Sequence, residues 1–357
     1  MKDLIFKVEN SSVKLTCLKE AAQIIDLLPD NSKYCVVADA DVIKLHKNFT
    51  DLLVERGYLI FEVSAAEKNK NIETYTQIID FMQKNEMKRS DRLLGLGGGA
   101  ITDLAGFVAS TYMRGIQYFQ IPTSLLAQVD ASIGGKTGIN HGHIKNFIGS
   151  FYNPAEVFIC SEFLKTLNEQ EFLNGFSEVL KHSLITSQQS LEKLKERAEK
   201  ILSQDTEVLL ECIEESIEIK AQVVASDFKE SGVRKYLNFG HTFAHGIESI
   251  NDSKPIFHGH AVTIGMQMAL GYSHQLGFLK SDSYKLAINT ICEFNYDFSD
   301  IALDANRIFE AMKSDKKNTK TMNLVLLKDI GHPFIYEEHS NEILKDYINK
   351  FIHEFKK

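Results

Sequence analysis

Two short segments in the second half of the chain gather histidines at spacings suited to metal binding. LNFGHTFAH places His241 and His245 four residues apart, which puts both on one face of a helix. FHGH adds His258 and His260. Two histidines and one carboxylate bind zinc while leaving a coordination position for a substrate oxygen. Spacing alone makes His241 with His245 the obvious pair and His258 a lesser candidate.

A carboxylate for such a site stands in FSEVLKHSL, where Glu178 and Lys181 share one face of a predicted helix. A surface ion pair is one explanation of this spacing, and a metal ligand beside a cation is the other. Arg234 and Asn238, just before the histidines, are further polar candidates for the same site. The chain has no H-E-x-x-H segment, which disfavours a metalloprotease.

The segment GLGGGAITD follows an apolar strand pattern and opens a helical one. Gly95, Gly97 and Ala100 fit the loose form of the dinucleotide fingerprint, in which glycines let backbone N–H groups approach a pyrophosphate. A match of this kind is weak, because a tight strand-to-helix turn also favours glycine. Nucleotide binding and a purely structural turn both remain open on the motif alone.

A second polar segment is denser. QIPTSLLAQVDASIGGKTGIN carries Asp130 and Lys136 among glycines and hydroxyls, and IKNFIG adds Lys145 and Asn146. Lysines are usually solvated surface residues, but lysines set among Gly, Thr and Asn are typical of anion binding. The spacing G-x-x-x-x-G-K-[ST] is missing, so the segment is not a P-loop.

Composition bounds the class of protein. The 357 residues are 44% hydrophobic and 25% charged, as in soluble globular proteins, and the formal charge is −8. A net negative chain offers no general attraction for nucleic acid or an acidic membrane. Five scattered cysteines without C-x-x-C indicate reduced thiols, and we find no signal-peptide pattern or membrane-spanning apolar run. We therefore expect a cytoplasmic protein.

The elements that must position these residues follow from periodicity. Buried strands are predicted at 34–39, 58–63, 92–99, 116–122 and 157–160, with helices between them at 74–82 and 100–110. This alternation predicts an α/β N-terminal nucleotide-binding domain with a parallel doubly wound sheet, over residues 1–161. Residues 162–357 are predicted to form a mainly α-helical metal- and substrate-binding domain, with helices at 162–219, 241–276 and 341–355 and one strand at 322–328. We expect a cleft between the two.

The sequence as a whole resembles the 3-dehydroquinate synthase family over nearly its full length. The blocks that carry the resemblance are GGGAITDLAGFVAS, YMRGIQYFQIPTSLLAQVDASIGGKTGIN, KNFIGSFYNP, GFSEVLKHSLI, LNFGHTFAHGIES, HGHAVTIGM and SDKKN. Long blocks in the family's order are far more specific than any single motif. The resemblance implies a lyase of the shikimate pathway of aromatic amino acid biosynthesis, a homodimer that binds NAD and zinc, with cobalt as an alternative metal.

The resemblance also implies roles residue by residue. The metal ligands would be Glu178, His241 and His258, so His245 would face the substrate instead. NAD would contact Glu67, Lys70, Gly99, Ala100, Ile101, Thr102, Asp103, Thr123, Ser124, Lys136 and Lys145. The catalytic group would comprise Asp130, Lys136, Lys181, Arg234 and His245, and the further substrate-binding residues would be Asn146, Lys220, Asn238, Lys316 and, across a dimer interface, Arg114.

In that family the substrate is 3-deoxy-D-arabino-heptulosonate 7-phosphate, a phosphorylated sugar acid. NAD oxidises it transiently so that a C–H bond becomes acidic, phosphate leaves, the ketone is reduced again, and an intramolecular aldol closure gives 3-dehydroquinate. The metal activates the alcohol oxygen. The departing phosphate takes the proton, so no side chain is assigned as the sole base.

The chain departs from the family pattern at several positions: Thr102, Ser124, the segment AAEKNK at 65–70, the segment HGHI at 141–144, and His260. Three other functions stay open as alternatives. Another sugar-phosphate cyclase would share the fold and the metal site. A metal-dependent polyol dehydrogenase of the iron-containing alcohol dehydrogenase type would not need the cationic cluster, and neither would a non-catalytic sensor.

Overall fold

The computed structural model describes residues 2–8, 11–30, 32–142, 144–251, 253–254, 256–314 and 321–355. The chain groups into two compact units. Unit 1 comprises Met1–Asn168 and Ile213–Phe228, and unit 2 comprises Glu169–Cys212 and Lys229–Lys357. Among the helices of the described ranges, none is both long enough and apolar enough to cross a bilayer.

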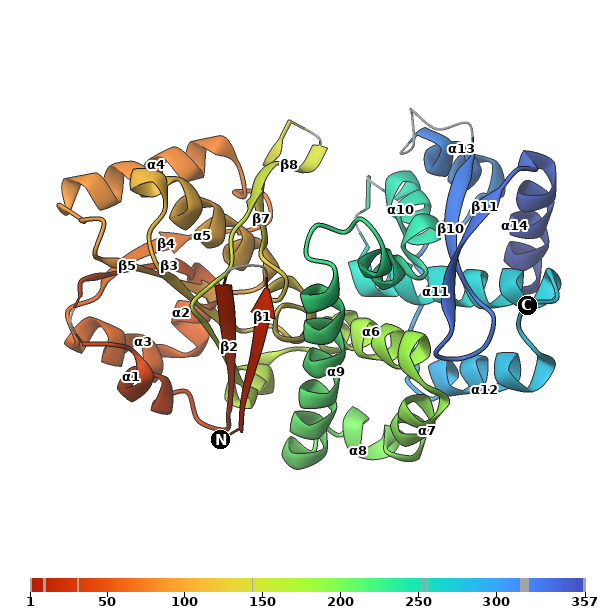
Figure 1. The fold of residues 1–357 in the computed structure, drawn as a ribbon, viewed down its shortest axis with the longest axis horizontal. Helices are drawn as coiled ribbons and strands as arrows, with labels where there is room; N and C mark the ends of the chain where they lie inside the picture. The colour runs from red at the N-terminus through yellow and green to blue at the C-terminus, as the bar shows by residue number, and fades with distance from the viewer. Residues whose placement is uncertain are drawn as a thin grey trace. The chain divides into compact units, whose positions relative to one another are not determined.

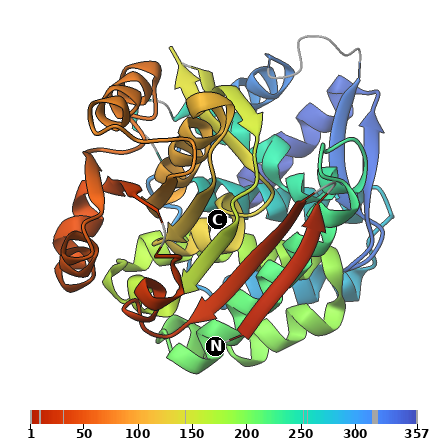
Figure 2. The ribbon, with the colours of Figure 1, turned by 60° about the vertical axis from the view of Figure 1, so that its left-hand side comes forward.

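Unit 1 is built on a mixed sheet whose strands, over the described residues, follow the order β1-β2-β9-β6-β5-β3-β4. Every neighbouring pair is parallel except β1 and β2, which lie antiparallel, side by side at one edge (Figure 2). The bounds are β1 (Lys2–Val8), β2 (Ser11–Leu18), β3 (Tyr34–Asp39), β4 (Leu59–Val63), β5 (Arg92–Gly97), β6 (Tyr118–Pro122) and β9 (Glu156–Cys160). A separate antiparallel hairpin pairs β7 (Lys136–His141) with β8 (Ile144–Phe151).

The central strands send alternate side chains into two cores, as a sheet covered on both faces requires. On β3, Val36 packs into one core and Val37 into the other. The first core contains residues of α1 (Gln23–Leu27) and α3 (Lys47–Glu55), and the second contains residues of α4 (Ile72–Lys84) and α5 (Gly99–Thr111) (Figure 1). Short elements complete the unit: α2 (Ala40–Leu45), η1 (Tyr112–Arg114), η2 (Ala127–Ala131) and η3 (Ser161–Thr166).

The strand order creates a switch point beside α5. From β3 the chain moves outward to β4, and then returns to place β5 on the other side of β3. Ligands of open α/β sheets bind at the carboxyl ends of strands at such a switch point. The glycine-rich turn after β5 therefore stands where this fold class receives a ligand.

Unit 2 is mainly helical. Its central helix is α11 (His258–Gln275), which is buried along most of its length and packs against α6 (Glu169–Thr186) and α10 (His241–Ile250). The remaining elements are α7 (Gln188–Glu196), α8 (Ala198–Leu202), η4 (Val233–Asn238), α12 (Ser281–Cys292), α13 (Ala305–Ser314), the antiparallel pair β10 (Met322–Leu327) and β11 (Pro333–Glu338), and α14 (Asn341–Phe355). The long helix α9 (Thr206–Ser226) contributes to both units.

The predicted fold class is confirmed: unit 1 holds the doubly wound α/β sheet, and unit 2 is mainly helical. The five predicted strands of the first half are all present. The sequence pattern missed the edge pair β1 and β2, the hairpin of β7 and β8, the strand β11, and the helices α12 and α13. The domain division at residues 161 and 162 stays a prediction.

Candidate active site

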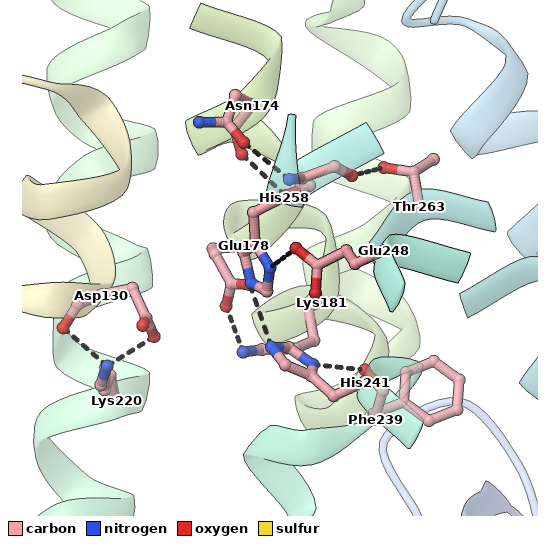
Figure 3. A network of polar contacts seen from close by, with 12 residues as sticks. Asp130, Asn174, Glu178, Lys181, Lys220, Phe239, His241, Glu248, His258 and Thr263 are labelled. Atoms are coloured by element: carbon pink, nitrogen blue, oxygen red, sulfur yellow. Dashed lines mark hydrogen bonds and ion pairs between the residues drawn. The ribbon is translucent and has the colours of Figure 1, made fainter. Parts of the chain in front are cut away.

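Three predicted metal ligands lie together in unit 2. Glu178 comes from the middle of α6, His241 is the first residue of α10, and His258 is the first residue of α11 (Figure 3). One donor atom of each lies within 4.8 Å of the others. Gly240 makes the approach of α10 to α11 feasible, because its φ is +80° and a Cβ there would lie 2.7 Å from the backbone nitrogen of Met266.

The two histidines are held by their Nδ1 atoms. Nδ1 of His241 lies 3.3 Å from the carbonyl oxygen of Phe239, and Nδ1 of His258 lies 3.1 Å from Oε1 of Glu248. Partners of this kind leave Nε2 as the donor for a metal. Nε2 of His241 lies 3.7 Å from Oε1 of Glu178, so the donors converge.

The carboxylate at the centre of this group is buried, with Glu178 only 1% exposed. Among the described residues its Oε1 accepts no hydrogen bond, while its other oxygen contacts Nζ of Lys181 as an ion pair. A buried carboxylate oxygen without a donor is costly unless a cation completes it. One carboxylate and two imidazoles are a donor set that zinc accepts. The residues present therefore fit a divalent metal.

The pKa values of the two histidines are shifted in opposite directions. Burial lowers the pKa of His241 well below its ordinary value, and the nearby Lys181 acts in the same direction. Burial alone would also lower the pKa of His258, but the hydrogen bond and charge of Glu248 outweigh it and raise that pKa. His241 is thus neutral at pH 7, whereas the carboxylates of Glu248 and Glu178 both favour the protonated form of His258.

Four further predicted residues lie in the described part of unit 2. Lys181 and Arg234 are buried, each 2% exposed. Asn238 is exposed, and its Nδ2 donates to Oε1 of Glu230 at 2.8 Å. His245 is exposed on α10, with its ring centroid 5.8 Å from that of His241. Lys316 lies outside the described residues.

In the glycine-rich turn of unit 1, Gly97 is closely packed against α5, whereas Gly98 has open space beside it. A Cβ on Gly97 would lie 2.7 Å from Cγ1 of Ile101, so only glycine fits between β5 and α5. Gly98 is the N-cap residue of α5, and a Cβ there would meet only Oγ of Ser124, at 3.5 Å. Within the described chain no side chain caps this helix start. Helix N–H groups with room above them fit a pyrophosphate.

Polar residues predicted to contact the nucleotide form a connected network beside this turn. Nζ of Lys70 donates to Oδ2 of Asp103 at 2.7 Å, with Lys70 buried. The carbonyl of Lys70 accepts from the backbone N–H of Asn140, whose Nδ2 donates to Oε1 of Glu67 at 3.2 Å. Burial raises the pKa of Asp103, against the opposing charge of Lys70. Glu67, Asn140 and Lys145 also line a pocket of about 540 Å³.

The remaining residues predicted for the nucleotide are in or beside the same turn. Ala100, Ile101 and Thr102 follow Gly99 on the first turns of α5, and the hydroxyl of Thr102 donates to the Gly99 carbonyl at 2.9 Å. The backbone N–H of Thr123 donates to the carbonyl of Gly97 at 3.0 Å, which fixes the end of β6 beside the turn.

The predicted substrate residues of unit 1 include one tight ion pair. Nζ of Lys220, on α9, donates to Oδ1 of Asp130 at 2.5 Å and to the Asp130 carbonyl at 2.6 Å. Lys136 is an exposed residue that begins β7, and Asn146 is exposed on β8 with a φ of +54°. Arg114 is exposed in a turn after α5.

Sequence reasoning missed two residues that contact the metal-ligand segments. Glu248 lies two helical turns after His241 on α10, a spacing that was readable from the sequence. Asn174 lies one turn before Glu178 on α6, and its Oδ1 accepts from the backbone N–H of Gly259 at 2.6 Å. Only the tertiary structure reveals that contact, because the two residues are far apart along the chain.

Comparison with known protein families identifies the family of this chain. Residues 60–174 match the family described as 3-dehydroquinate synthase N-terminal, and residues 175–318 match the one described as 3-dehydroquinate synthase C-terminal. The chain belongs to the 3-dehydroquinate synthase family. The predicted resemblance is thereby confirmed, and with it the prediction of an enzyme of the lyase class.

Individual relatives cover most of the chain. A 3-dehydroquinate synthase of Chlorobium luteolum is 42% identical over 318 residues, which are 86% of this chain and 87% of the relative. One of Campylobacter concisus is 37% identical over 97% of this chain and 99% of the relative. A bifunctional 3-dehydroquinate synthase/phosphatase of Fusobacterium nucleatum is 40% identical over 93% of this chain, which spans about half (51%) of that longer relative.

Solved structures share the fold at low identity. A 2-epi-5-epi-valiolone synthase of Streptomyces hygroscopicus, with NAD⁺ and Zn²⁺ bound, has a TM-score of 0.87 at 22% identity, and covers 98% of this chain and 99% of that one. A 2-deoxy-scyllo-inosose synthase complexed with carbaglucose-6-phosphate, NAD⁺ and Co²⁺ has a TM-score of 0.86 at 20% identity, with the same coverage. An iron-containing alcohol dehydrogenase of Thermococcus thioreducens, also with the same coverage, reaches 0.68 at 12%. These likenesses concern the fold.

Proposed function

We propose that this chain converts 3-deoxy-D-arabino-heptulosonate 7-phosphate to 3-dehydroquinate and phosphate. The observation that carries the proposal is the group of Glu178, His241 and His258, whose donors lie within 4.8 Å of one another in a chain of this family. Beside that group stands the buried cation of Lys181, which a reaction on a neutral polyol would not need. The metal ligands, the nucleotide site and the substrate site are all part of this proposal.

The cofactors proposed are NAD and one divalent metal, zinc or cobalt. When bound, the nucleotide supplies reversible hydride acceptance and the metal supplies polarisation of a substrate oxygen. Glu178, His241 and His258 would hold the metal. The turn at Gly98, where a Cβ would meet only Oγ of Ser124, would hold the nucleotide. Two solved structures of the same fold carry NAD⁺ with Zn²⁺ or Co²⁺, which supports this choice.

The substrate carries a carboxylate and a phosphate, and the cations of this chain suit both. In unit 2, Lys181 and Arg234 are buried, where a charge-assisted hydrogen bond to an anion is strong. In unit 1, Lys220 is buried against Asp130, and Lys136 is an exposed cation. Arg234 would hold an anion in a fixed geometry, because its guanidinium presents a rigid fork of donors.

A homodimer is proposed together with this function. The turn that carries Arg114 has positive φ values at Met113, Arg114 and Gly115. Two successive non-glycine residues in this region cost on the order of 1–3 kcal/mol each, and such strain persists mainly at functional positions. Met113 is 48% exposed beside it. An Arg114 that reaches a second copy of the chain accounts for both features, and sedimentation of wild type and Arg114→Ala tests it.

The proposed location is the cytoplasm. All five cysteines lie within the described ranges as free thiols, and four of them are buried. Thiols without disulfide partners suit a reducing compartment.

The deciding experiment is a phosphate-release assay with the heptulosonate phosphate. Catalytic amounts of NAD should support many turnovers, with one phosphate released per product and no steady rise in NADH absorbance. Preincubation with a chelator should stop the release, and added zinc should restore it. Stoichiometric NADH would identify a polyol dehydrogenase, and absence of phosphate release would contradict the proposal outright.

A further inference from the structure

The helix α10 carries two different groups on one face. His241 is its first residue, and Glu248 follows seven residues later, which is two turns along the same stripe. The helix therefore aims both side chains toward the start of α11, where His258 stands. Both residues belong to α10, and Figure 3 shows the carboxylate of Glu248 facing the ring of His258.

The contact between Glu248 and His258 is directional. Oε1 of Glu248 lies 3.1 Å from Nδ1 of His258, and the two side chains are 22% and 33% exposed. An Nδ1 that donates to a carboxylate fixes the imidazole tautomer, so that Nε2 carries the lone pair. The same hydrogen bond fixes the rotation of the ring about its bond to Cβ.

We propose that Glu248 is a positioning residue for the metal site: it orients His258 and holds its Nε2 as the metal donor. The proposal rests on the proposed function, since it assigns Glu248 to the same metal site. Glu248 itself would not touch the metal. Its carboxylate would act through His258 by raising the basicity of the imidazole ring. It would also restrict rotation of the ring before the metal binds, so that less conformational entropy is lost on binding.

The other contacts near the site do not account for the orientation of the His258 ring as directly as Glu248 does. Asn174 accepts from the backbone N–H of Gly259, a contact that anchors the start of α11 through its main chain. His241 is oriented by the neutral carbonyl of Phe239, at the longer distance of 3.3 Å. A charged acceptor makes the stronger hydrogen bond. His258 is therefore the ligand whose geometry depends most on one side chain.

The test compares Glu248→Leu, which removes the acceptor, with Glu248→Gln, which keeps an acceptor oxygen without the charge. The matched control is Glu310→Gln, at an exposed carboxylate on α13. Zinc affinity is measured by competition with a chromophoric chelator, and cobalt-substituted proteins give a ligand-field spectrum. Neither readout depends on turnover.

We expect Glu248→Leu to bind zinc about 10- to 100-fold more weakly than wild type, with an altered cobalt spectrum. Glu248→Gln should fall between the two, and Glu310→Gln should match wild type. Wild-type affinity in Glu248→Leu would overturn the proposal, as would a Gln variant no tighter than the Leu variant. If Glu248→Leu does not fold, wild-type affinity in Glu248→Gln would be the overturning result.

The outcomes separate this inference from the function on which it rests. A wild-type protein that binds no zinc or cobalt would contradict the metal site itself, and with it the proposed reaction. A wild-type protein that binds metal tightly, beside variants that bind it equally well, would remove only the role of Glu248.

Discussion

The metal group of unit 2 and the glycine turn of unit 1 are built in opposite ways. The metal group draws side chains from α6, α10 and α11, and its central carboxylate is 1% exposed. The glycine turn is local: a few successive residues expose backbone N–H groups at the start of α5. One site depends on tertiary packing of three helices, and the other on the lack of side chains at one turn.

This difference sets how each site responds to substitution. In the candidate metal group, loss of one side chain would remove a proposed ligand and leave the other two polar groups without their shared partner, so we expect a large effect. In the glycine turn, an added side chain is harmful where it meets protein atoms or the space that a ligand needs. The two regions therefore call for opposite experiments, removal in unit 2 and addition in unit 1.

The largest expected effect separates the two histidine pairings. His258→Ala should abolish tight metal binding, because it removes one of three donors that lie within 4.8 Å of one another. His245→Ala should keep the metal, because His245 is an exposed residue outside that group. It should lose activity, because the family resemblance implies that His245 faces the substrate. Elemental analysis of the purified proteins measures this. A metal-free His245 variant beside a metal-loaded His258 variant would restore the H-x-x-x-H pairing that spacing alone suggests.

That pairing shows where sequence reasoning reaches its limit. The buried strands of unit 1 were predictable because they read as short apolar runs, and several helices of unit 2, though not α12 and α13, because their periodicity is strong. The grouping of Glu178, His241 and His258 was not predictable in this way. His241 and His245 are close in sequence, whereas His258 comes near His241 because α10 and α11 pack together at Gly240. Only the family resemblance named His258 together with Glu178 and His241, the three residues whose donor atoms converge in the structure.

The missed elements have physical reasons as well. The pair β1 and β2 is an edge hairpin with several exposed positions, so it lacks the apolar run of a buried strand. The hairpin of β7 and β8 is mostly exposed on β8 and is rich in glycine. Asn174 and Glu248 carry ordinary polar side chains, and their partners are set by tertiary contact.

The second prediction concerns the anion-binding residues of the two units. Arg234→Ala and Lys136→Ala should each lower kcat/KM about tenfold to over a hundredfold, since a charge-assisted hydrogen bond is worth about 1.5–3 kcal/mol. Arg234 should cost more, because it is 2% exposed while Lys136 is exposed to solvent. Steady-state phosphate release measures both, with circular dichroism as the check on folding. Wild-type efficiency in both variants would contradict the anion-site assignment.

The third prediction concerns added methyl groups at the glycine turn. Gly97→Ala should destabilise the protein by about 1–3 kcal/mol, because its Cβ would lie 2.7 Å from Cγ1 of Ile101. Gly98→Ala should fold normally, since its φ of −72° suits any residue and its Cβ would meet only Oγ of Ser124, at 3.5 Å.

The Gly98 variant should bind NAD about tenfold more weakly, a loss of about 1.4 kcal/mol, because the methyl group enters the space above the helix start. Thermal unfolding and NAD titration by fluorescence measure the two effects separately. NAD binding unchanged in Gly98→Ala would place the nucleotide away from this turn.

The smallest expected effect concerns two hydrogen bonds at helix starts, one beside the metal group and one at the start of α7. We compare how the loss of each changes stability and zinc affinity. Oδ1 of Asn174 accepts from the backbone N–H of Gly259 at 2.6 Å, and Oγ of Ser187 accepts from that of Ser190 at 3.1 Å at the start of α7. Removing either acceptor should lower the free energy of unfolding by about 1 kcal/mol, as for other helix starts.

Asn174→Ala should also weaken zinc binding by a few-fold, because Gly259 follows His258 directly, whereas Ser187→Ala should leave zinc affinity unchanged. Denaturant unfolding of the metal-free proteins and chelator competition measure the two quantities. Equal zinc affinities in the two variants would mean that the packing of α11 against α6 alone fixes His258 in place.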